Sequence, residues 1–370
     1  MNTIFRMLLV LSLASCATPK TNPSTEKPSR LLAELTEFVN ATAPNRSAGQ
    51  LGHEKASKWI EARFRELSEK IPGAKVYRHS FYPDVAFAEK NYRSDFVRLV
   101  AKKFPKKSET YLKWKAFTDS AIQFVKQFEK VPGQNWILEI PGATEPRDVL
   151  YIGGHYDTIT HDHQTMKFTV EGVAPGADDN ASGFIAMLSL AEYFAAHPPS
   201  KTLRFVAFDD EEIFFLGSYA FAKDYLKKKL PFSVKKERYA GLINLEMIGW
   251  STLKTRPNVP VKIYTRANGQ KGAKNDEILA DMLLKQTPAP GVWNLKPEIL
   301  KNGFDRSDQW SFWQKGLSAV CISEDWENDF NEKNYHTAND TPATLNDAYL
   351  NAVTEWVKSG VIAWTKDSKK

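Results

Sequence analysis

Apolar residues recur along this chain with two different spacings. Between residues 30 and 67 they follow the three- and four-residue spacing of a helix, interrupted at residues 43–52, so we expect two helices flanking a loop. From residue 135 onward, short and nearly continuous apolar runs alternate with helical patterns over 181–196 and 217–229. The runs are NWILEI (135–140), VLYIGG (149–154), LRFVAF (203–208), LINLEM (242–247), VKIYT (261–265) and LSAVCI (317–322). Strands that are apolar on both sides imply a sheet that is covered on both faces. We therefore predict an α/β fold, a three-layer α/β/α sandwich around a mixed, mostly parallel sheet.

A helical insertion is predicted over residues 88–131. Apolar residues recur there at steps of three and four, and lysines occupy the opposite face of the helix. Packing against the main domain is the favoured interpretation of this stripe, and a lid over the active site is the alternative. The stripe comprises Tyr111, Trp114, Phe117, Ala121, Val125 and Phe128.

The first fifteen residues form a separate segment. Arg6 precedes a short apolar run that is too brief to span a bilayer, which is typical of a secretory signal. The sequence LASC at 13–16 resembles the lipobox of bacterial lipoproteins, which implies lipidation of Cys16. Residues 16–29 are rich in Pro, Ser, Thr and Lys, so we expect a disordered tether. These features predict an exported bacterial lipoprotein, held by its lipid anchor at the outer membrane and facing the periplasm.

The remaining residues, 30–370, have the composition of one large globular domain. The chain has 370 residues, of which 42% are hydrophobic and 25% are charged. Its formal net charge of +6 is spread over many lysines, and no arginine-rich run alternates with aromatic residues as a nucleic-acid groove requires. Cys321 lies within an apolar run and is expected to be a buried thiol. The composition therefore argues against a nucleic-acid partner.

Histidines and acids follow the ends of the predicted strands, where α/β sheets bind their ligands. His155 closes one strand and precedes Asp157, a spacing that suits a metal ligand and a carboxylate that orients it. Asp178 and Asp179 lie in the turn GADDNASG before a helix. One aspartate would suffice to cap that helix, so the second indicates another purpose.

Further acids and a histidine come at three later positions. Residues 209–212 are Asp-Asp-Glu-Glu directly after a buried strand, and four adjacent acids there favour a bound cation. Glu246 is an acid in an apolar run, which is rare unless the residue is paired or binds a metal. His336 lies in a polar turn after the last apolar run. His53 and His79 are left unassigned, because a surface or capping histidine is more common at such positions than a ligand, and His161 and His163 are interpreted as surface residues.

Together these positions supply two imidazoles and at least three carboxylates, enough to hold a pair of divalent ions bridged by an aspartate. The motifs GGHYDT, PGADDNASG, FVAFDDEE followed by LGS, INLEMIG and YHTANDT share the order and spacing of a known enzyme family. Over about residues 133–360 the chain resembles the co-catalytic zinc aminopeptidases of metallopeptidase family twenty-eight. That family also contains glutamate carboxypeptidase II and glutaminyl cyclases.

The resemblance implies a zinc exopeptidase fold with two zinc ions per chain. Asp179 would bridge both ions, followed by a cis peptide bond, while Asp178 supports the turn or caps the helix. His155 and Glu246 would complete one zinc site, and Glu212 and His336 the other. The implied metal ligands are thus His155, Asp179, Glu212, Glu246 and His336.

The same resemblance implies an aminopeptidase acting on peptides. Glu211 would be the general base on a water that bridges the metals, and Asp157 would orient His155. The chain departs from the family at three places. Glu246 stands where many relatives have aspartate, and Phe214 and Phe215 stand where the aminopeptidases usually have a glycine. Gln309 stands where histidine is common.

Two other functions remain open from the sequence. The stretch DDEEIFF resembles the glutaminyl cyclases, which use a single zinc and transfer an acyl group without hydrolysis. A catalytically inactive binding module, as in the transferrin receptor, is the third possibility. Such a chain would be expected to lose ligands or the base, whereas this one keeps them, so hydrolysis is favoured.

Overall fold

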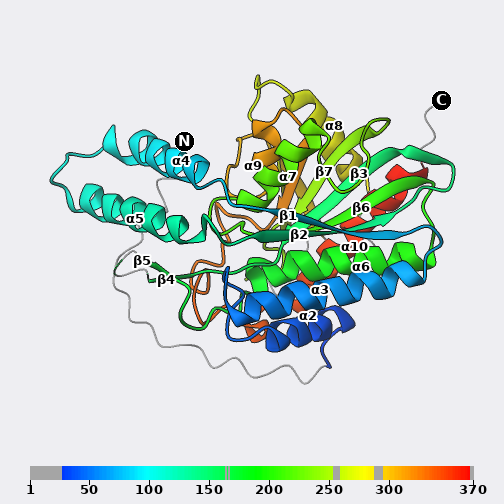
Figure 1. Ribbon diagram of the computed structural model, residues 1–370, viewed down its shortest axis with the longest axis horizontal. Helices are drawn as coiled ribbons and strands as arrows, with labels where there is room; N and C mark the ends of the chain where they lie inside the picture. The colour runs from blue at the N-terminus through cyan, green and yellow to red at the C-terminus, as the bar shows by residue number, and fades with distance from the viewer. Residues whose placement is uncertain (1–26, 163–164, 166, 253–258, 287–294, 367–370) are drawn as a thin grey trace.

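A single mixed sheet of eight strands forms the centre of the structure (Figure 1). The computed structural model describes residues 27–162, 165, 167–252, 259–286 and 295–366. Across the sheet the strand order is β1-β2-β6-β3-β7-β10-β8-β9. The strands are β1 (Lys75–Phe81), β2 (Gly133–Ile140), β3 (Glu145–His155), β6 (Lys201–Phe208), β7 (Arg238–Leu245), β8 (Val259–Tyr264), β9 (Leu295–Leu300) and β10 (Ala319–Ser323).

The centre of the sheet is parallel and its margins are mixed. Strands β6, β3, β7 and β10 run parallel to one another. On one side β2 pairs antiparallel with β6 and with β1, and on the other β8 pairs antiparallel with β10 and parallel with β9. The predicted mixed sheet is confirmed. Because parallel strands share one carboxyl edge, the residues that follow β3, β6 and β7 meet there.

Helices cover both faces of the sheet because its strands are apolar on both sides. In β3, Leu150 and Ile152 belong to the core on one face, and Val149 and Tyr151 to the core on the other. The first core includes residues of α2 (Arg30–Ala41), α3 (Leu51–Glu69), α6 (Gly183–Ala196), α8 (Ala273–Leu284) and α10 (Asp347–Lys366). The second includes residues of α7 (Leu216–Lys227) and α9 (Gln309–Gln314). The chain therefore folds as the predicted α/β/α sandwich.

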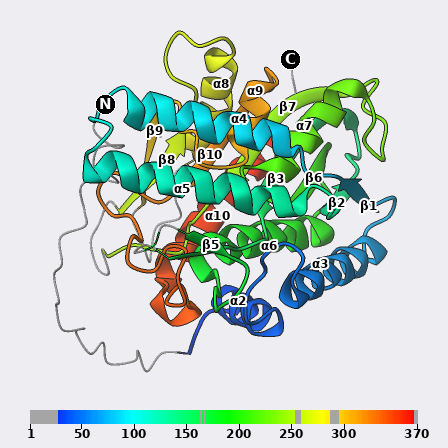
Figure 2. The same cartoon turned by 60° about the vertical axis from the view of Figure 1, so that its left-hand side comes forward.

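Two helices project from the sandwich as an arm, a name used here for residues 85–128 (Figures 1 and 2). The arm consists of α4 (Val85–Phe96), the π-helical turn η1 (Val97–Ala101), α5 (Glu109–Val125) and the short η2 (Lys126–Phe128). Beside α5 lies a hairpin of β4 (Thr160–Asp162) and β5 (Lys167–Thr169). At the root, arm residues share a core with Ile213 and Leu216 of the main body: Val85, Ala88, Phe124, Val125 and Phe128. The root of the arm thus packs on the body.

Residues 1–26, which include the predicted signal and Cys16, lie outside the described residues, and so does His163. Ser29 already belongs to the fold. Its side chain accepts the N–H of Leu32 as the N-cap of α2 and donates to Oδ1 of Asp347 at 2.5 Å. Within the described ranges, no helix is both long and apolar enough to cross a membrane.

Candidate metal centre

His155 is the last residue of β3 and is fully buried at the carboxyl edge of the sheet. Its Nδ1 lies 3.3 Å from Oδ1 of Asp157. The two oxygens of Asp157 also accept the backbone N–H groups of Glu211 and Glu212, each at 3.1 Å. One carboxylate therefore fixes the histidine of β3 to the turn that follows β6.

Asp179 lies in the turn before α6, between His155 and His336. The turn starts at Gly176, with a φ of 55°, where a Cβ atom would lie 2.4 Å from the backbone oxygen of Asp179 and only glycine fits. The peptide bond between Asp179 and Asn180 is cis, as the resemblance implies. Oδ1 of Asp179 lies 3.2 Å from Nε2 of His155, and Oδ2 lies 3.1 Å from Nε2 of His336. Each oxygen of one carboxylate thus faces a different histidine.

Two groups of three possible ligands meet at this point. The groups are His155, Glu211 and Glu246, and Asp179, Glu212 and His336. Nε2 of His155 lies 3.4 Å from Oε2 of Glu246, and Nε2 of His336 lies 2.9 Å from Oε2 of Glu212. Two ligands of a tetrahedral zinc, each about 2.0–2.2 Å from the ion, are about 3.3 Å apart. The structure therefore brings together all five side chains expected to bind metal, at separations that suit it.

Several buried polar atoms here make no well-formed hydrogen bond within the described part of the chain. They are both ring nitrogens of His155, Nε2 of His336 and Oε1 of Glu212. Leaving buried polar groups unpaired is costly, and bound cations would satisfy Nε2 of both histidines and Oε1 of Glu212, while Nδ1 of His155 faces Asp157. Imidazole nitrogen and carboxylate oxygen are both zinc donors. The residues fit divalent metal ions.

Crowded carboxylates shift the protonation of the histidines. Burial lowers the pKa of His336, but Glu212 and Asp179 outweigh burial and raise this pKa to about 10. His155 is shifted in the same direction, since Glu211 and Glu246 raise its pKa well above the usual value despite burial. Burial raises the pKa of Glu212 to about 7, with His336 opposing the rise. A metal ion has to displace these protons, so its binding is coupled to proton release.

Glu211 differs from the other acids of the site in being held less tightly. Burial raises the pKa of its carboxyl well above the usual range, and its Oε2 lies 3.9 Å from Nε2 of His155. Its side chain accepts no hydrogen bond from a described residue. By contrast, Oε2 of Glu246 accepts the hydroxyl of Ser307 at 2.7 Å. Glu211 can therefore exchange a proton without breaking a structural contact.

Asp308 is a buried carboxyl that sequence analysis did not single out. Neither of its oxygens makes a hydrogen bond of good geometry to a described residue. Burial raises its pKa to about 8, an effect that His155 opposes and Glu246 reinforces. Asp308 is the residue directly before α9. The loop-like sequence around it gave no sign that this side chain is buried beside the metal groups.

Arg46 is a second buried residue that the sequence left inside a loop. Its Nε and Nη1 donate to the carbonyls of Tyr156 and Pro175, each at 2.6 Å, and Nη2 donates to Gly176 at 2.8 Å. Burial lowers its pKa to about 10, with Asp340 and other nearby acids opposing. The carbonyl of Tyr156 directly precedes Asp157, and the carbonyls of Pro175 and Gly176 lie at the start of the turn that carries Asp179. Arg46 therefore joins two segments that carry site residues.

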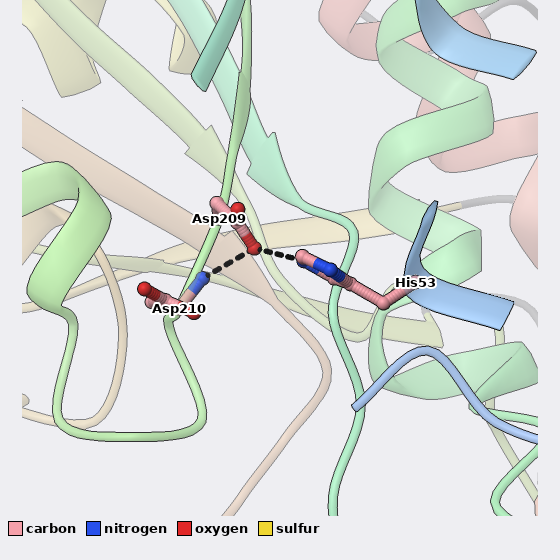
Figure 3. A group of neighbouring side chains, drawn as sticks. All are labelled: His53, Asp209 and Asp210. Carbon is pink, nitrogen blue, oxygen red and sulfur yellow. Dashed lines mark hydrogen bonds and ion pairs between the residues drawn. The ribbon is translucent and has the colours of Figure 1, made fainter. Parts of the chain in front are cut away.

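His53 and Asp209 form a pair in which Asp209 is fully buried and the side chain of His53 is 12% exposed (Figure 3). Nε2 of His53, in the first turn of α3, lies 2.6 Å from Oδ1 of Asp209. The same carboxylate accepts the N–H groups of Asp210 and Gln134 at 2.9 and 2.7 Å. Burial lowers the pKa of His53, but Asp209 outweighs burial and raises it. His53, which the sequence left unassigned, is thus paired with Asp209, and the acids of 209–212 divide between this pair and the metal groups.

Asp178 supports the loops around the site. Its Oδ1 accepts the N–H of Gly249 at 2.8 Å, and its Oδ2 accepts the side chain of Asn331 at 2.7 Å. The N–H of Gly183, the first residue of α6, donates to Oδ1 of Asn180 at 3.1 Å, and the oxygens of Asp178 accept from other segments, so the capping alternative for Asp178 is wrong. The supporting role is confirmed.

Two other histidines are also less exposed than expected. His79 is buried in β1, with Nε2 3.2 Å from Oδ2 of Asp224. His161, in β4, has its ring centroid 5.4 Å from that of Phe117 in the arm and 4.9 Å from that of Phe168. Neither histidine belongs to the metal groups among the described residues.

Aromatic side chains from the arm and the body flank the turn of Glu211 and Glu212. Phe214 lies with its ring centroid 4.6 Å from that of Tyr92 in α4 and 5.8 Å from that of Trp310. Burial raises the pKa of Tyr92, and Glu211 and Glu212 add to the rise, so α4 lies close to the site. Phe214 and Phe215 have φ values of 79° and 59°, a conformation that favours glycine, the residue usual there in the aminopeptidases.

The fold and the site define a class: an α/β sandwich with histidines and carboxylates at the carboxyl edge of its sheet, as in metal-dependent hydrolases. The model of peptidase family M28 matches residues 135–361. The chain belongs to this peptidase family.

Similar proteins include both curated sequences and solved structures. Aminopeptidase YwaD of Bacillus subtilis is 28% identical over 272 residues, 71% of this chain and 49% of the relative. A probable zinc metalloprotease of Pyrenophora tritici-repentis is 30% identical over 190 residues, 47% of this chain and 41% of the relative. The chain thus spans about half the length of these curated relatives, or less.

Among solved structures, BSAP, a zinc aminopeptidase from Bacillus subtilis, superposes with a TM-score of 0.61 at 19% identity, covering 92% of this chain and 96% of that one. The glutaminyl cyclase of Fimbriiglobus ruber gives a TM-score of 0.60 at 20% identity, covering 95% and 99%. These likenesses establish the fold.

Proposed function

We propose that this protein is a dinuclear zinc aminopeptidase that releases N-terminal residues from peptides. The observation that carries the proposal is the carboxylate of Asp179, whose two oxygens face His155 and His336 separately. Each oxygen would hold one zinc ion. His155 and Glu246 would complete one site, and Glu212 and His336 the other.

The chemistry divides between the metals and the side chains. When bound, the zinc ions supply Lewis acidity that lowers the pKa of an attacking water toward about 7 and polarises the scissile carbonyl. Glu211 accepts a proton from the water and delivers it to the departing amine. Its raised pKa allows the carboxyl to hold that proton between the two transfers. Asp157 keeps His155 oriented and fixes the backbone that presents Glu211.

An aminopeptidase agrees with the names of YwaD and BSAP. The alternative is a glutaminyl cyclase-like enzyme with a single zinc, because the Fimbriiglobus ruber glutaminyl cyclase shares the fold. Five ligand side chains arranged around a shared aspartate favour two metals and hydrolysis. Retention of Glu211 and of every ligand argues against an inactive binding module.

One experiment separates these functions. The purified protein is assayed with and without a chelator against dipeptides with free or blocked amino groups and against glutaminyl peptides, and its metal content is measured. We expect two zinc ions per chain and hydrolysis of the free dipeptides only. One zinc ion with cyclisation of glutaminyl peptides would support the cyclase, and full metal content without turnover would support the binding module.

We propose further that the enzyme is an exported lipoprotein at the outer membrane, facing the periplasm. The support is the sequence LASC at 13–16 and the polar tether after it. Labelling cells with a radioactive fatty acid should mark the wild type and leave the Cys16→Ser variant unlabelled. Equal labelling of both would overturn the proposal.

A further inference from the structure

The far end of the arm is strongly basic. We define the arm tip as residues 97–113, which contain six basic residues and one acid, Glu109. Arg98 is neutralised by Asp95 and Asp305, at 2.7 and 3.1 Å. Four lysines of the tip are exposed and form no ion pair with a described residue: Lys102, Lys103, Lys106 and Lys107. The tip therefore carries an uncompensated positive charge.

Other lysines of the arm behave differently. Lys115 pairs with Asp119 at 2.5 Å, one turn along α5, and Lys126 pairs with Glu89 at 3.0 Å. Outside the tip, Lys90 of α4 is the one arm lysine that is exposed without an ion pair to a described residue, whereas the tip holds four such lysines within positions 102–107. This contrast separates the tip from an ordinary solvated lysine face.

Apolar side chains are exposed beside the unpaired lysines. Val97 is 46% exposed and Leu112 is 55% exposed. The rings of Phe96 and Tyr111, with centroids 5.2 Å apart, hold α4 against α5 at this end, so Val97 and Leu112 belong to the same surface. A surface that is both basic and apolar suits the interface of a membrane, where lysine meets lipid headgroups and the apolar groups enter the layer beneath.

The shape of the arm makes this surface accessible. The root is fixed by the core that it shares with Ile213 and Leu216, and Arg98 at the start of the tip pairs with Asp305 of the body. The turn between α4 and α5 extends from the body (Figures 1 and 2). A projecting end can reach a flat surface without obstruction by the sandwich. A nucleic-acid strand would instead require a groove with stacked aromatic side chains.

We propose that the arm tip binds the surface of an anionic phospholipid membrane. Each lysine close to such a surface strengthens adsorption roughly fivefold, which corresponds to about 1 kcal/mol. The inference does not depend on the proposed peptidase activity. It gives the enzyme a second contact with the bilayer, in addition to the lipid expected at Cys16.

The contact would set the orientation of the active site. Tyr92 of α4 lies near Glu211 and Glu212, and the five residues from Tyr92 to Val97, where the tip begins, rise about 8 Å along the helix. A tip that rests on the headgroups would therefore hold Glu211 and Glu212 on the order of 10 to 20 Å from the bilayer. The site would face peptides close to the membrane surface.

The test is co-sedimentation with lipid vesicles. Residues 27–366 contain every described helix and strand, so a chain that begins at residue 17 keeps the fold and carries no lipid. We expect it to bind vesicles of equal parts phosphatidylglycerol and phosphatidylcholine, to bind phosphatidylcholine alone at least tenfold less, and to be released by salt. No binding to the anionic vesicles, or equal binding to both kinds, would overturn the proposal.

A matched pair of variants locates the contact. Changing the four unpaired tip lysines to Gln should weaken binding tenfold or more. A control removes the same charge from the body: Lys227→Gln, Lys229→Gln, Lys235→Gln and Lys236→Gln, all at exposed positions with no ion pair to a described residue. The control should bind within about twofold of the wild type, because the attraction falls off within one Debye length, about 10 Å. Equal loss in both variants would show that net charge alone binds the vesicles and would overturn the proposal.

Discussion

Asp178 and Asp179 are adjacent and identical in chemistry, yet their surroundings give them different roles. Each oxygen of Asp178 accepts a hydrogen bond, one from Gly249 and one from Asn331. Asp179 faces His155 and His336, whose Nε2 atoms lack well-formed hydrogen bonds within the described residues. The role of a carboxylate in this protein is therefore decided by its partners.

The role of Glu211 is tested by substitution with its amide. Glu211→Gln should keep both metals and lose about 10²- to 10⁴-fold in kcat, because the amide cannot accept the proton. Asp210→Asn is a control from the same turn, because Asp210 groups with His53 and Asp209 and not with the proposed metal ligands. Steady-state kinetics with parallel metal analysis measures both. A Glu211→Gln enzyme that turned over at the wild-type rate would disprove the assignment of the base.

The pair of His53 and Asp209 should make stability depend on pH. The folded-state pKa of His53 is raised, so its contribution is fully present below the unfolded value near 6.5 and is lost as pH rises through the folded pKa. His53→Gln should therefore cost about 2 kcal/mol at pH 6 and less at pH 9. Urea unfolding of the metal-loaded protein at both values checks this. A larger loss of unfolding free energy in His53→Gln at pH 9 than at pH 6 would contradict a protonated His53 paired with Asp209.

At the scale of elements, short loops fix how helices and strands deliver side chains to the site. The loop between α2 and α3 carries Arg46, which binds the carbonyls after β3 and before α6. Helix α3 starts against this loop, since a Cβ atom on Gly52 would lie 1.9 Å from the carbonyl oxygen of Asn45. The packing of α3 against this loop and the position of Arg46 in the loop therefore depend on each other.

This close approach predicts a large effect of a small substitution. Gly52→Ala should destabilise the fold by about 3 kcal/mol or more, because the clash is with backbone that has to move. It should also reduce zinc occupancy, since the moving loop carries Arg46. Lys55→Ala, on the exposed side of the same helix, is the control and should change stability by less than about 0.5 kcal/mol. Thermal unfolding and metal analysis measure the two effects, and an unchanged Gly52→Ala protein would contradict the packing.

At the scale of the whole molecule, the metal centre links the ends of several strands. Residues from β3, from the turns after β6 and β7, and from the loops of Asp179 and His336 meet at one edge of the sheet. Because metal binds the folded arrangement only, zinc should stabilise the entire domain. At 100 times its dissociation constant the gain is about 2.7 kcal/mol per site.

The size of this gain should depend on pH. Without metal, the pKa of His336 is about 10 and that of Glu212 about 7, so zinc competes with protons and its affinity should fall as pH decreases from 8 to 6. Thermal unfolding with and without zinc at both pH values measures the shift in Tm. Asp179→Ala should abolish the shift, and a shift that grew toward pH 6 would contradict proton competition.

The local pattern of apolar residues along the chain was sufficient to predict much of the fold. Continuous apolar runs predict strands with two buried faces, and the six runs correspond to six of the eight strands of the central sheet. The other two strands, β1 and β9, lie at the two edges of the sheet. Strand β9 has the sequence LKPEIL with a proline and two charged residues, which an edge strand tolerates. The side chains brought together as metal groups were also found from sequence, because strand ends share one edge.

The sequence by itself thus determined the layers of this protein and the set of residues at the carboxyl edge of its sheet, since periodicity and motif spacing are local properties. Tertiary structure alone decided which partner each polar residue meets. His53 and Asp209 are 156 positions apart, and Asp178 and Asn331 are 153 apart. Their pairing depends on how distant segments pack and on hydrogen-bond geometry, which no local spacing encodes. The projection of the arm, which leaves four lysines of its tip unpaired, was likewise set by packing at its root.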